Sequence, residues 1–359
     1  MIKIVTIVGA RPQFIKAAAV SRAIRSTHVR SIEEILVHTG QHYDENMSQV
    51  FFDELDIPHP KFNLEISGGT HGGMTGRMLE AIENVLLTEK PDWMLIYGDT
   101  NSTLAGALAA AKLHIPVAHV EAGLRSFNMR MPEEINRIVA DRVSNFLFCP
   151  TQTAVENLAR EGVTKGVSLV GDVMYDVSLY YRDVARSRSD ALDRFGLKEG
   201  EYVLATCHRA ENTDDPSRLR EIGFALADLA VDQPVVLPVH PRTAKILASQ
   251  GLAATMKDVK LVDPLPFLDM IRLEQSARVI VTDSGGVQKE AFFYDVPCVT
   301  MRDETEWLET VELGWNILAG ACREKIVSAV SAPTRPESKG SSPYGDGKAS
   351  EKIVTTLCS

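Results

Sequence analysis

Acidic and basic side chains are interleaved over residues 119–137, "HVEAGLRSFNMRMPEEINR". The stretch holds the acids Glu121, Glu133 and Glu134 and the basic or imidazole side chains His119, Arg125, Arg130 and Arg137. Glu121 directly follows "IPVAHV", an apolar run typical of a buried parallel strand, so this carboxylate is expected at the end of a strand. A carboxylate held there can transfer a proton, whereas one on an open helix face is merely solvated.

Glu133 follows Pro132 at an expected helix start, and Arg137 lies four residues further on, at the spacing of an ion pair along one helix face. For Glu134 we expect a solvated position on the same helix. Asp99 follows another apolar run in "DWMLIYGDTNST", where capping of the next helix is a purely structural alternative. Together, Asp99, Glu121 and Glu133 predict three carboxylates converging from separate strand or helix ends of one domain.

A second chemical signal lies in "TDSGGVQKEAFF", residues 282–293, where an apolar strand passes into a helix. Ser284, Gly285 and Gly286 at this junction would let backbone N–H groups and the positive helix end approach an anion closely. Glu290 lies within the first two helical turns, where a carboxylate can accept hydrogen bonds from a ribose diol. The structural alternative is an ordinary strand-to-helix turn with a surface glutamate.

Two further strand ends carry cations or imidazole groups. Arg11 and Lys16 in "VGARPQFIK" could neutralise a diphosphate or a sugar carboxylate, and cations at a helix start are otherwise unfavourable. His208 and Arg209 follow "YVLATC"; His208 could exchange a proton or hydrogen-bond a phosphate, or it could simply end the strand. We expect packing roles for His119 and a structural role for His240.

Several catalytic signatures are absent from the sequence. "VGARPQFIK" has a single glycine in place of GxGxxG, which argues against a dinucleotide oxidoreductase. "HRAEN" is not HExxH, no His/Asp/Glu set has the spacing of a metal site, and no GxSxG turn occurs. The sequence therefore predicts neither a metal nor a cofactor, and it disfavours metal-dependent and serine hydrolases.

Short β-branched runs alternate with helical patterns along the chain, as expected of α/β domains with parallel sheets covered on both faces. The rhythm pauses in the charged helical stretch after residue 172 and restarts at "YVLATCH". We expect two doubly wound, Rossmann-like domains, 1–172 and 173–345, with a C-terminal helix at 346–359. Ligands of such sheets bind at the carboxyl ends of the strands, which predicts a cleft between the domains.

Length and composition agree with this division, since 359 residues exceed what one core usually serves. The net charge of -10 disfavours nucleic acid and anionic membranes as partners. Five scattered cysteines without a CxxC pair indicate reduced thiols, and we expect Cys207 and Cys298 in the core. No signal peptide or apolar run of about 18 residues occurs, so a cytoplasmic location is expected.

The motifs "GARPQFIK", "TGQHYD", "GDTNST", "HVEAGLRS", "MPEEINR", "HRAEN", "HPRT" and "TDSGGVQKEA" resemble, in order, those of the non-hydrolysing UDP-N-acetylglucosamine 2-epimerases. The resemblance runs from the first strand to about residue 318. It implies the two-domain GT-B architecture, a C-terminal helix that returns to the first domain, a UDP-sugar substrate and a homodimer.

The resemblance also implies roles for individual residues. The proton-transfer acids fall on Asp99, Glu121 and Glu133, and a supporting histidine falls on His208. The residues that match the family's cleft and nucleotide positions are Arg11, Lys16, Arg137, Arg209, Ser284, Gly285, Gly286 and Glu290. The uracil-stacking aromatic is assigned to Phe267, although the spacing to Ser284 is about three residues longer than in some members.

Substrate identity and outcome stay open at this stage. "TGQHYDENM" and "GGTHGGMTGR" differ from the stretches that form an activating second substrate site in regulated members, which argues against such activation. "SFNMRMPEE" is closer to a branch that acts on a 2,3-diacetamido uronate, for which Arg130 is a candidate extra cation. A hydrolysing epimerase, a GT-B glycosyltransferase and a non-catalytic nucleotide-sugar sensor also stay open, although the clustered acids argue against the sensor.

Overall fold

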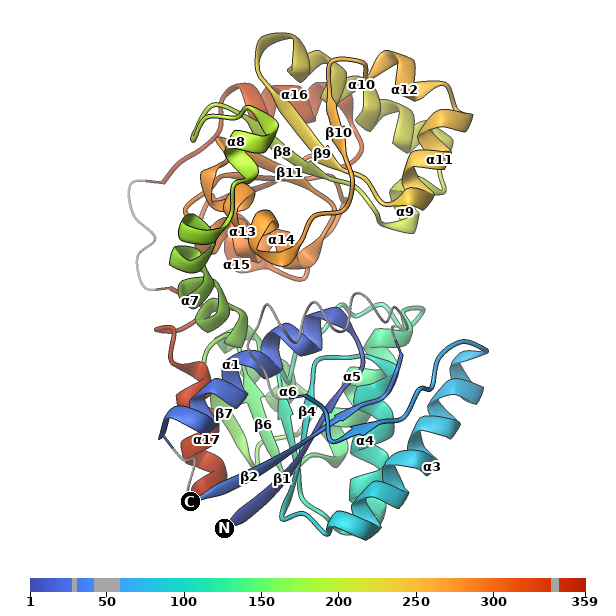
Figure 1. The fold of residues 1–359 in the computed structure, drawn as a ribbon, viewed down its shortest axis with the longest axis vertical. Coiled ribbons are helices and arrows are strands. Elements are labelled where there is room, and N and C mark those ends of the chain that lie inside the picture. Colours follow the sequence, from blue (N-terminus) through green and yellow to red (C-terminus); the bar gives the residue numbers. More distant parts are fainter. Residues whose placement is uncertain (28–30, 42–58, 337–341) are drawn as a thin grey trace. The chain divides into compact units, whose positions relative to one another are not determined.

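The structure is a computed structural model that describes residues 1–27, 31–41, 59–336 and 342–359. The chain divides into two compact units, Met1–Val177 with Ser341–Ser359, called unit 1, and Ser178–Gly340, called unit 2. Figure 1 shows each unit as a parallel sheet with helices on its faces. The structure therefore confirms the α/β class with two doubly wound sheets.

Unit 1 contains a seven-stranded sheet in the order β3-β2-β1-β4-β5-β6-β7. Its strands are β1 (Ile2–Val8), β2 (Ile32–His38), β3 (Phe62–Asn63), β4 (Trp93–Tyr97), β5 (Val117–Val120), β6 (Phe146–Cys149) and β7 (Val167–Leu169). Its helices are α1 (Arg11–Thr27), α3 (His71–Glu89), α4 (Asn101–Lys112), α5 (Pro132–Val143), α6 (Gln152–Arg160) and α17 (Ala349–Cys358), and α7 (Val173–Arg188) spans the boundary of the units.

Unit 2 contains a six-stranded sheet in the order β10-β9-β8-β11-β12-β13. Its strands are β8 (Val203–Thr206), β9 (Val235–Pro238), β10 (Lys260–Val262), β11 (Val279–Thr282), β12 (Cys298–Thr300) and β13 (Asn316–Leu318). Its helices are α8 (Ala191–Phe195), α9 (Ala210–Thr213), α10 (Pro216–Asp232), α11 (Pro241–Ser249), α12 (Leu252–Thr255), α13 (Phe267–Ser276), α14 (Gly285–Phe293), α15 (Leu308–Glu312) and α16 (Arg323–Ser331).

The strand order reverses next to the first strand of each sheet. In unit 1 β1 lies between β2 and β4, and in unit 2 β8 lies between β9 and β11. The connections on the two sides of such a point leave the sheet in opposite directions and open a crevice at the carboxyl ends of the strands. The segments after β1, β4, β8 and β11 are therefore the natural ligand-binding segments, and they carry most of the candidate site residues.

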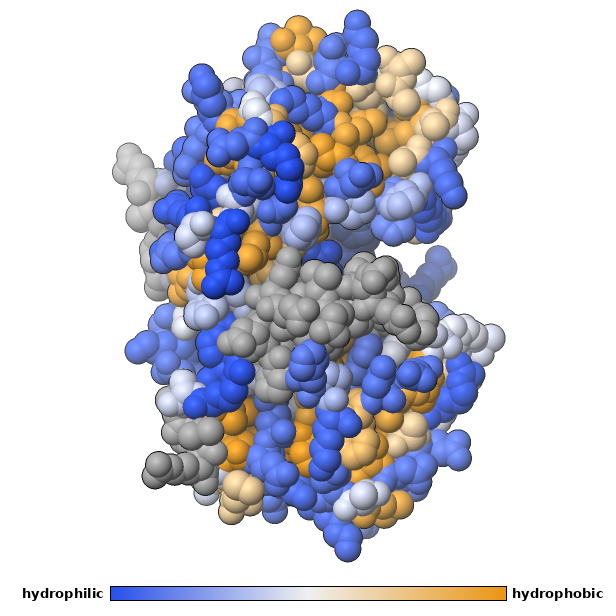
Figure 2. Space-filling view, viewed as in Figure 1, coloured by the Kyte–Doolittle hydropathy of each residue, from blue (hydrophilic) through white to orange (hydrophobic). Residues whose placement is uncertain are grey.

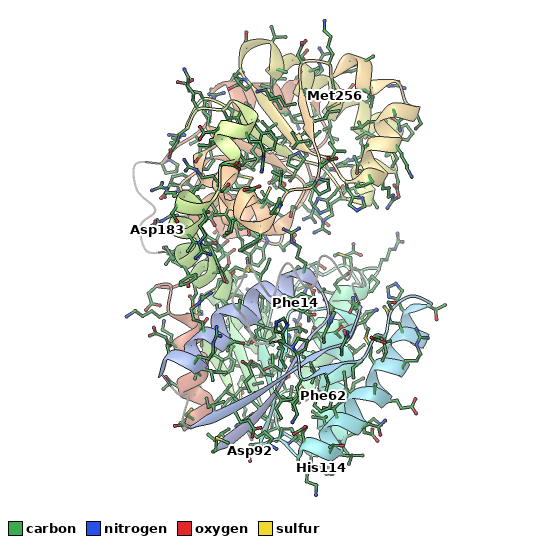
Figure 3. The ribbon with its side chains drawn as sticks, in the orientation of Figure 1. Phe14, Phe62, Asp92, His114, Asp183 and Met256 are labelled. Carbon is green, nitrogen blue, oxygen red and sulfur yellow. The ribbon has the colours of Figure 1, made fainter. Side chains whose placement is uncertain are left out.

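Apolar composition explains why these segments form central strands. All four residues of β5, β8 and β11 are buried, as expected where helices cover both faces of a parallel sheet. The helix α4 is rich in alanine, and a Cβ at Gly106 would lie 3.2 Å from both Ile7 and Ile96, so a small residue lets α4 approach the sheet closely. Phe14 on α1, labelled in Figure 3, contacts the His38 ring edge to face at a centroid distance of 5.1 Å.

The C-terminal helix α17 belongs to unit 1. The carboxylate of Asp176 on α7 accepts hydrogen bonds from the backbone N–H groups of Ala349 (3.1 Å) and Ser350 (2.7 Å), so it caps the start of α17. On the face drawn in Figure 2, hydrophilic side chains cover most of the surface of both units, with apolar side chains between them. Within the described ranges, no helix combines the length and apolarity needed to cross a bilayer.

Candidate active site

Hydrogen bonds connect the turn between β1 and α1 to the end of β4. The Gln13 side chain is buried and accepts hydrogen bonds from the N–H groups of Gly9 (2.9 Å) and Ala10 (3.1 Å). Its amide nitrogen donates to the Tyr97 carbonyl at 2.8 Å. Gly9 has to be a glycine because a Cβ there would overlap the hydroxyl of Ser102. These contacts fix the start of α1, which carries Arg11 and Lys16, against the end of β4, two residues before Asp99.

Lys16 forms an ion pair with Glu121 at the end of β5. The two side chains are 10% and 11% exposed, so the pair is nearly buried yet open at one side. A Cβ at Gly98 would lie 3.5 Å from Lys16 Nζ and 3.7 Å from Glu121 Oε2, which places the pair directly beside the residue preceding Asp99. The structure thus brings together predicted site residues that follow three different strands.

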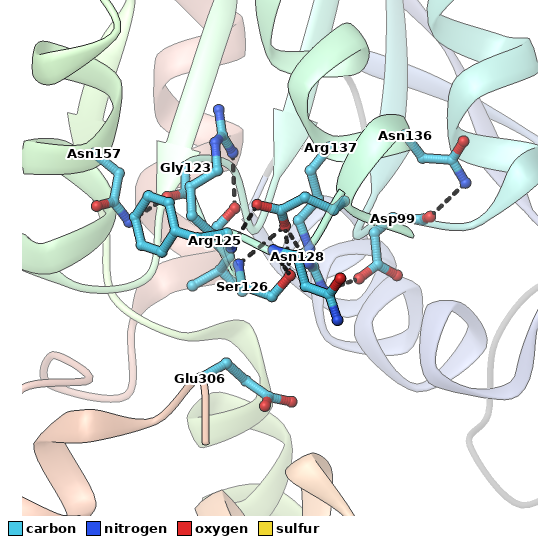
Figure 4. Close-up of polar contacts among 12 residues, drawn as sticks. Asp99, Gly123, Arg125, Ser126, Asn128, Asn136, Arg137, Asn157 and Glu306 are labelled. Carbon is cyan, nitrogen blue, oxygen red and sulfur yellow. Dashed lines mark hydrogen bonds and ion pairs between the residues drawn. The ribbon is translucent and has the colours of Figure 1, made fainter. Parts of the chain in front are cut away.

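Asp99 is held by Arg137, as the close-up in Figure 4 shows. Arg137 Nη2 donates to Asp99 Oδ2 at 2.6 Å, and its Nη1 donates to Glu134 Oε2 at 2.8 Å. The Asn136 side chain also donates to the Asp99 carbonyl at 2.8 Å. The capping alternative for Asp99 is wrong, because Thr100 caps α4 through a hydrogen bond from the N–H of Thr103.

Two expectations for α5 are wrong. Arg137 pairs with Glu134, three residues away, and not with Glu133. Glu134 is only 1% exposed, contrary to the solvated position expected, because its carboxylate accepts from the N–H groups of Ser126 and Phe127, both at 2.9 Å. Burial opposes its ionisation, but these hydrogen bonds and Arg137 outweigh burial and lower the pKa of Glu134. Glu134 therefore fixes the 126–127 segment and orients Arg137 toward Asp99.

Glu133 lies in the first turn of α5 and is exposed. The described part of the chain gives its carboxylate no hydrogen bond or ion pair, so it differs from Asp99 and Glu121, each of which has a cation beside it.

His119 is completely buried, and this confirms the expectation that it packs in the core. Asp92 and His114, labelled in Figure 3, precede β4 and β5 and lie at the opposite edge of the sheet.

In unit 2 the turn from β11 to α14 has the form expected of an anion site. Ser284 caps α14, and its own N–H donates to the Thr282 hydroxyl at 2.9 Å. Gly285, the first residue of α14, is buried and Gly286 is exposed, and both lie at the positive end of the helix. Glu290 lies further along α14 and is half-buried.

A carboxylate that the motifs did not point to sits beside this turn. Glu306 Oε1 lies so close to Gly285 that a Cβ there would overlap it. Glu306 Oε2 accepts a hydrogen bond from Arg302 Nη1 at 2.8 Å, and Arg209 Nη2 lies 4.0 Å from Glu306 Oε1. Burial opposes ionisation, but Arg302 and Arg209 together with a backbone hydrogen bond lower the pKa of Glu306. Only a structure could reveal this, because "MRDETEW" has no spacing typical of an anion site.

A second missed acid, Asp283, shapes the segment after β8. Asp283 is fully buried and accepts hydrogen bonds from the backbone N–H groups of His208 (3.0 Å) and Arg209 (3.0 Å) and from the Asn212 side chain (3.2 Å). The His208 side chain is 53% exposed, with Nδ1 3.4 Å from Asp283. An aspartate directly after an apolar strand was the available signal. Through these hydrogen bonds Asp283 holds His208 and Arg209 at the carboxyl end of β8.

The structure bears differently on the two roles predicted for Phe267, base stacking, and for His240, a structural role. The Phe267 ring is 4% exposed and packs edge to face on Tyr181 at a centroid distance of 5.3 Å, so a base could stack on it only after this face is uncovered. His240 caps α11, accepting from the N–H of Arg242 at 3.3 Å, which confirms its structural role. Cys207 and Cys298 are buried, as expected.

One predicted motif lies half outside the described ranges. The last three residues of "TGQHYD" and the stretch that follows it fall in residues 42–58, outside the described residues. Among the residues that the structure describes, no group of three His, Cys, Asp or Glu side chains is placed to hold a metal ion.

The two doubly wound units and the paired acids are the features of a nucleotide-sugar enzyme, and comparison with known proteins identifies the family. The family model described as UDP-N-acetylglucosamine 2-epimerase matches residues 24–358. The chain belongs to this family. It is similar, at 54% identity over 99% of each chain, to the UDP-2,3-diacetamido-2,3-dideoxy-D-glucuronate 2-epimerase of Pseudomonas aeruginosa.

Solved structures agree with this assignment. The UDP-GlcNAc 2-epimerase of Methanocaldococcus jannaschii, in complex with UDP-GlcNAc and UDP, is 44% identical and has a TM-score of 0.87, with 99% of each chain covered. The Neisseria meningitidis enzyme bound to UDP-GlcNAc is 30% identical and has a TM-score of 0.89, again with 99% of each chain covered. The likeness confirms the GT-B class of fold and the family resemblance of the sequence motifs.

Proposed function

We propose that this chain is an isomerase that interconverts the C2 epimers of a UDP-2-acetamido sugar, UDP-GlcNAc and UDP-ManNAc. The observation that carries the proposal is that two carboxylates lie at the carboxyl ends of the unit 1 strands, each in an ion pair. Asp99 pairs with Arg137, and Glu121 pairs with Lys16. Family membership supplies the reaction class, and these residues are the groups in the described chain best suited to perform it.

The chemistry of the sugar explains why acids are needed. The C2 proton has no neighbouring carbonyl and is barely acidic, so its removal has to be coupled to loss of UDP from C1. A carboxylate takes the proton, the C2–H electron pair forms a C1–C2 double bond, and UDP leaves with the electron pair of the C1–O bond. The resulting 2-acetamidoglucal then adds UDP back at C1 and receives a proton on the opposite face of C2.

We assign the proton transfers to Asp99, Glu121 and Glu133. Two faces of C2 require at least two positioned acids or bases, and the ion pairs with Lys16 and Arg137 hold two of the three in fixed orientations. Glu133, exposed at the start of α5, can approach a bound sugar from another direction. We assign Arg11 to neutralising charge on the departing diphosphate.

Unit 2 is proposed to hold the nucleotide. The N–H groups of Gly285 and Gly286 with the Ser284 hydroxyl bind the diphosphate, and Glu290 accepts hydrogen bonds from the ribose. His208 and Arg209, presented by buried Asp283, support the diphosphate and its proton balance. The stacking assignment of Phe267 requires its contact with Tyr181 to open.

A second substrate is favoured by specific observations. The 54% identical P. aeruginosa relative is named for a 2,3-diacetamido glucuronate, which carries a carboxylate that UDP-GlcNAc lacks. Arg130 is exposed in the 126–131 segment beside the acids, and the described residues offer it no ion pair. A guanidinium there suits a uronate. The variant Arg130→Lys would separate the two substrates by weakening turnover of the uronate alone.

We further propose that the protein is a cytoplasmic homodimer. The dimer follows from the family resemblance, and the reduced state of the five scattered cysteines fits a reducing compartment. Light scattering at several concentrations of the purified protein would test the dimer: a mass of one chain at all concentrations would contradict it.

The test of the proposed reaction is product analysis with each sugar separately. UDP-GlcNAc and UDP-GlcNAc3NAcA are each incubated with the protein, and the products are separated by anion exchange and identified by the proton coupling between sugar C2 and C3. A manno-configured UDP-sugar at equilibrium with its substrate supports the proposal. Free sugar with a stoichiometric amount of UDP would indicate a hydrolysing enzyme, and unchanged substrate in both tubes would refute the epimerase assignment.

A further inference from the structure

A charged network, buried except at Glu161, lies next to the candidate acids of unit 1. His119 Nδ1 is 2.7 Å from Asp141 Oδ1, and the side chains are 0% and 1% exposed. Asp141 Oδ2 accepts from Arg125 Nη1 at 2.7 Å, and Arg125 continues to Glu161 through two hydrogen bonds of 2.6 and 2.8 Å. None of these four residues has a role in the proposed reaction.

Both nitrogens of the His119 ring face acceptors. Nδ1 meets the Asp141 carboxylate, and Nε2 meets the carbonyl of Gly98 at 2.7 Å. Only a doubly protonated imidazolium donates to both partners. Burial opposes ionisation of Asp141, but His119 and Arg125 outweigh burial and lower its pKa. His119 therefore links the Asp141 carboxylate to the Gly98 carbonyl, and Arg125 binds the other oxygen of Asp141.

His119 and Asp141 each form a hydrogen bond with the backbone close to one of the acids. His119 holds the carbonyl of Gly98, the residue before Asp99. Asp141 accepts from the N–H of Gly123 at 3.1 Å, two residues after Glu121. Figure 4 labels Gly123, Arg125 and Asp99 in this part of unit 1.

One residue of this backbone, Glu121, has an unfavourable conformation. Gly98, Glu121 and Gly123 have positive φ values of 60°, 70° and 80°. A non-glycine residue in this left-handed region is strained and persists only where the surroundings enforce it. Glu121 is such a residue, so some part of the structure has to hold it there. The N–H groups of Glu121 and Ala122 donate to the Phe148 carbonyl at 3.1 Å, and the hydrogen bonds of His119 to Gly98 and of Asp141 to Gly123 add to that restraint.

We propose that the buried His119–Asp141 pair is a positioning device that sets the separation and orientation of Asp99 and Glu121 for proton transfer. The inference rests on the proposed function of these two acids. His119 and Asp141 themselves do not touch the sugar, because neither side chain reaches solvent. They act through the backbone on both sides of the acids.

Asp141→Asn is the discriminating variant. The amide oxygen can still accept from His119, but the amide nitrogen cannot accept from Gly123 or Arg125, so the grip on the Glu121 turn is lost. A misplacement of about 1 Å at a reacting group costs roughly 100-fold in rate. We expect kcat to fall about 100-fold while the Kd for UDP, bound by unit 2, stays within about twofold.

Asp176→Asn is the matched control. Like Asp141, Asp176 is an aspartate of unit 1 that holds backbone N–H groups, but it is only partly buried, caps α17 and has no contact with the acids. His119→Gln is a second variant, since its amide can donate to only one of the two partners. Denaturant unfolding of each protein shows how much stability each substitution removes.

The proposal predicts that Asp141→Asn and His119→Gln lose far more kcat than Asp176→Asn at a comparable loss of stability. It also predicts faster hydrogen–deuterium exchange of the peptide covering residues 117–126 in both variants and unchanged exchange there in Asp176→Asn. Equal kcat in all three variants, or unchanged exchange of that peptide, would overturn the positioning role. An inactive wild type would instead refute the proposed function, and the exchange measurement would still decide the positioning role.

Discussion

Replacement of Glu121 by glutamine should affect kcat and the free energy of unfolding through two separate causes, the loss of a proton acceptor and the loss of an ion pair. Gln keeps the size of Glu but cannot take the C2 proton. Loss of a general base typically costs 10²- to 10⁴-fold in rate, so we expect kcat to fall at least about 100-fold, equivalent to about 2.7 kcal/mol in the activation barrier. The Kd for UDP should stay within about twofold, because the nucleotide is assigned to unit 2.

The stability cost follows from the environment of Lys16. Removing one partner of a buried ion pair costs about 3–5 kcal/mol, but here each side chain keeps about a tenth of its exposure and the Gln oxygen can still accept from Lys16. We therefore expect a loss of about 2 kcal/mol, which for a unit of roughly 200 residues lowers Tm by about 4–8 °C.

A double variant tests this explanation of the stability loss. Glu121→Gln with Lys16→Met removes the unpaired cation, and replacement of a buried pair by neutral groups is often close to neutral for stability. We expect Tm to recover and activity to remain lost. The assay is initial-rate epimerisation beside thermal unfolding for the wild type and both variants. A Glu121→Gln protein that turns over within about threefold of the wild type would refute the proton-transfer assignment.

The nucleotide turn and the α5 acids can be tested in the same way. Glu290→Ala should weaken UDP binding about 10-fold and abolish the preference for UDP over 2′-deoxy-UDP in calorimetry; a preserved preference would contradict the ribose contact. Gly285→Ala should lower the Tm of unit 2 because the new Cβ overlaps Glu306, whereas Gly286→Ala meets its nearest atom at 3.8 Å and should not; equal Tm values would argue against the Glu306 geometry. Glu134→Gln should cost about 2 kcal/mol at pH 7 by removing charge-assisted hydrogen bonds. Because the pKa of Glu134 is lowered from 4.5, that contribution is fully present above pH 4.5 and is lost as the pH falls through the lowered pKa, so the stabilities of the two proteins should converge in acid; a gap that does not narrow as the pH falls below 4.5 would contradict it.

The sequence predicted the architecture because the pattern of apolar runs is strong where strands are buried on both faces. The runs that became β1, β4, β5, β8 and β11 could be recognised from composition alone. The edge strands β3 and β13 have only two and three residues and no such pattern. Strand ends also located most candidate residues, since parallel strands present their carboxyl ends at one edge.

The details of the acid cluster could not be predicted from spacing. Glu133 and Glu134 are adjacent, and which of them is buried depends on how the 121–131 segment folds back over α5. Asp99 and Thr100 are also adjacent candidates for one helix cap, and the capping hydrogen bond to Thr103 decides for Thr100. Asp141 and Asp283 were missed because an acid inside an apolar context acquires its role only from backbone N–H groups brought near it by the fold.

Proton exchange at sugar C2 is the decisive observation for the proposed elimination. The purified protein is offered UDP-GlcNAc and UDP-GlcNAc3NAcA in separate tubes of heavy water, and the C2 proton is followed by NMR. Reversible elimination predicts that deuterium enters C2 of both the remaining substrate and the manno-configured product in at least one tube, and that Glu121→Gln stops this entry. Binding of both sugars without any exchange at C2 would contradict the elimination mechanism.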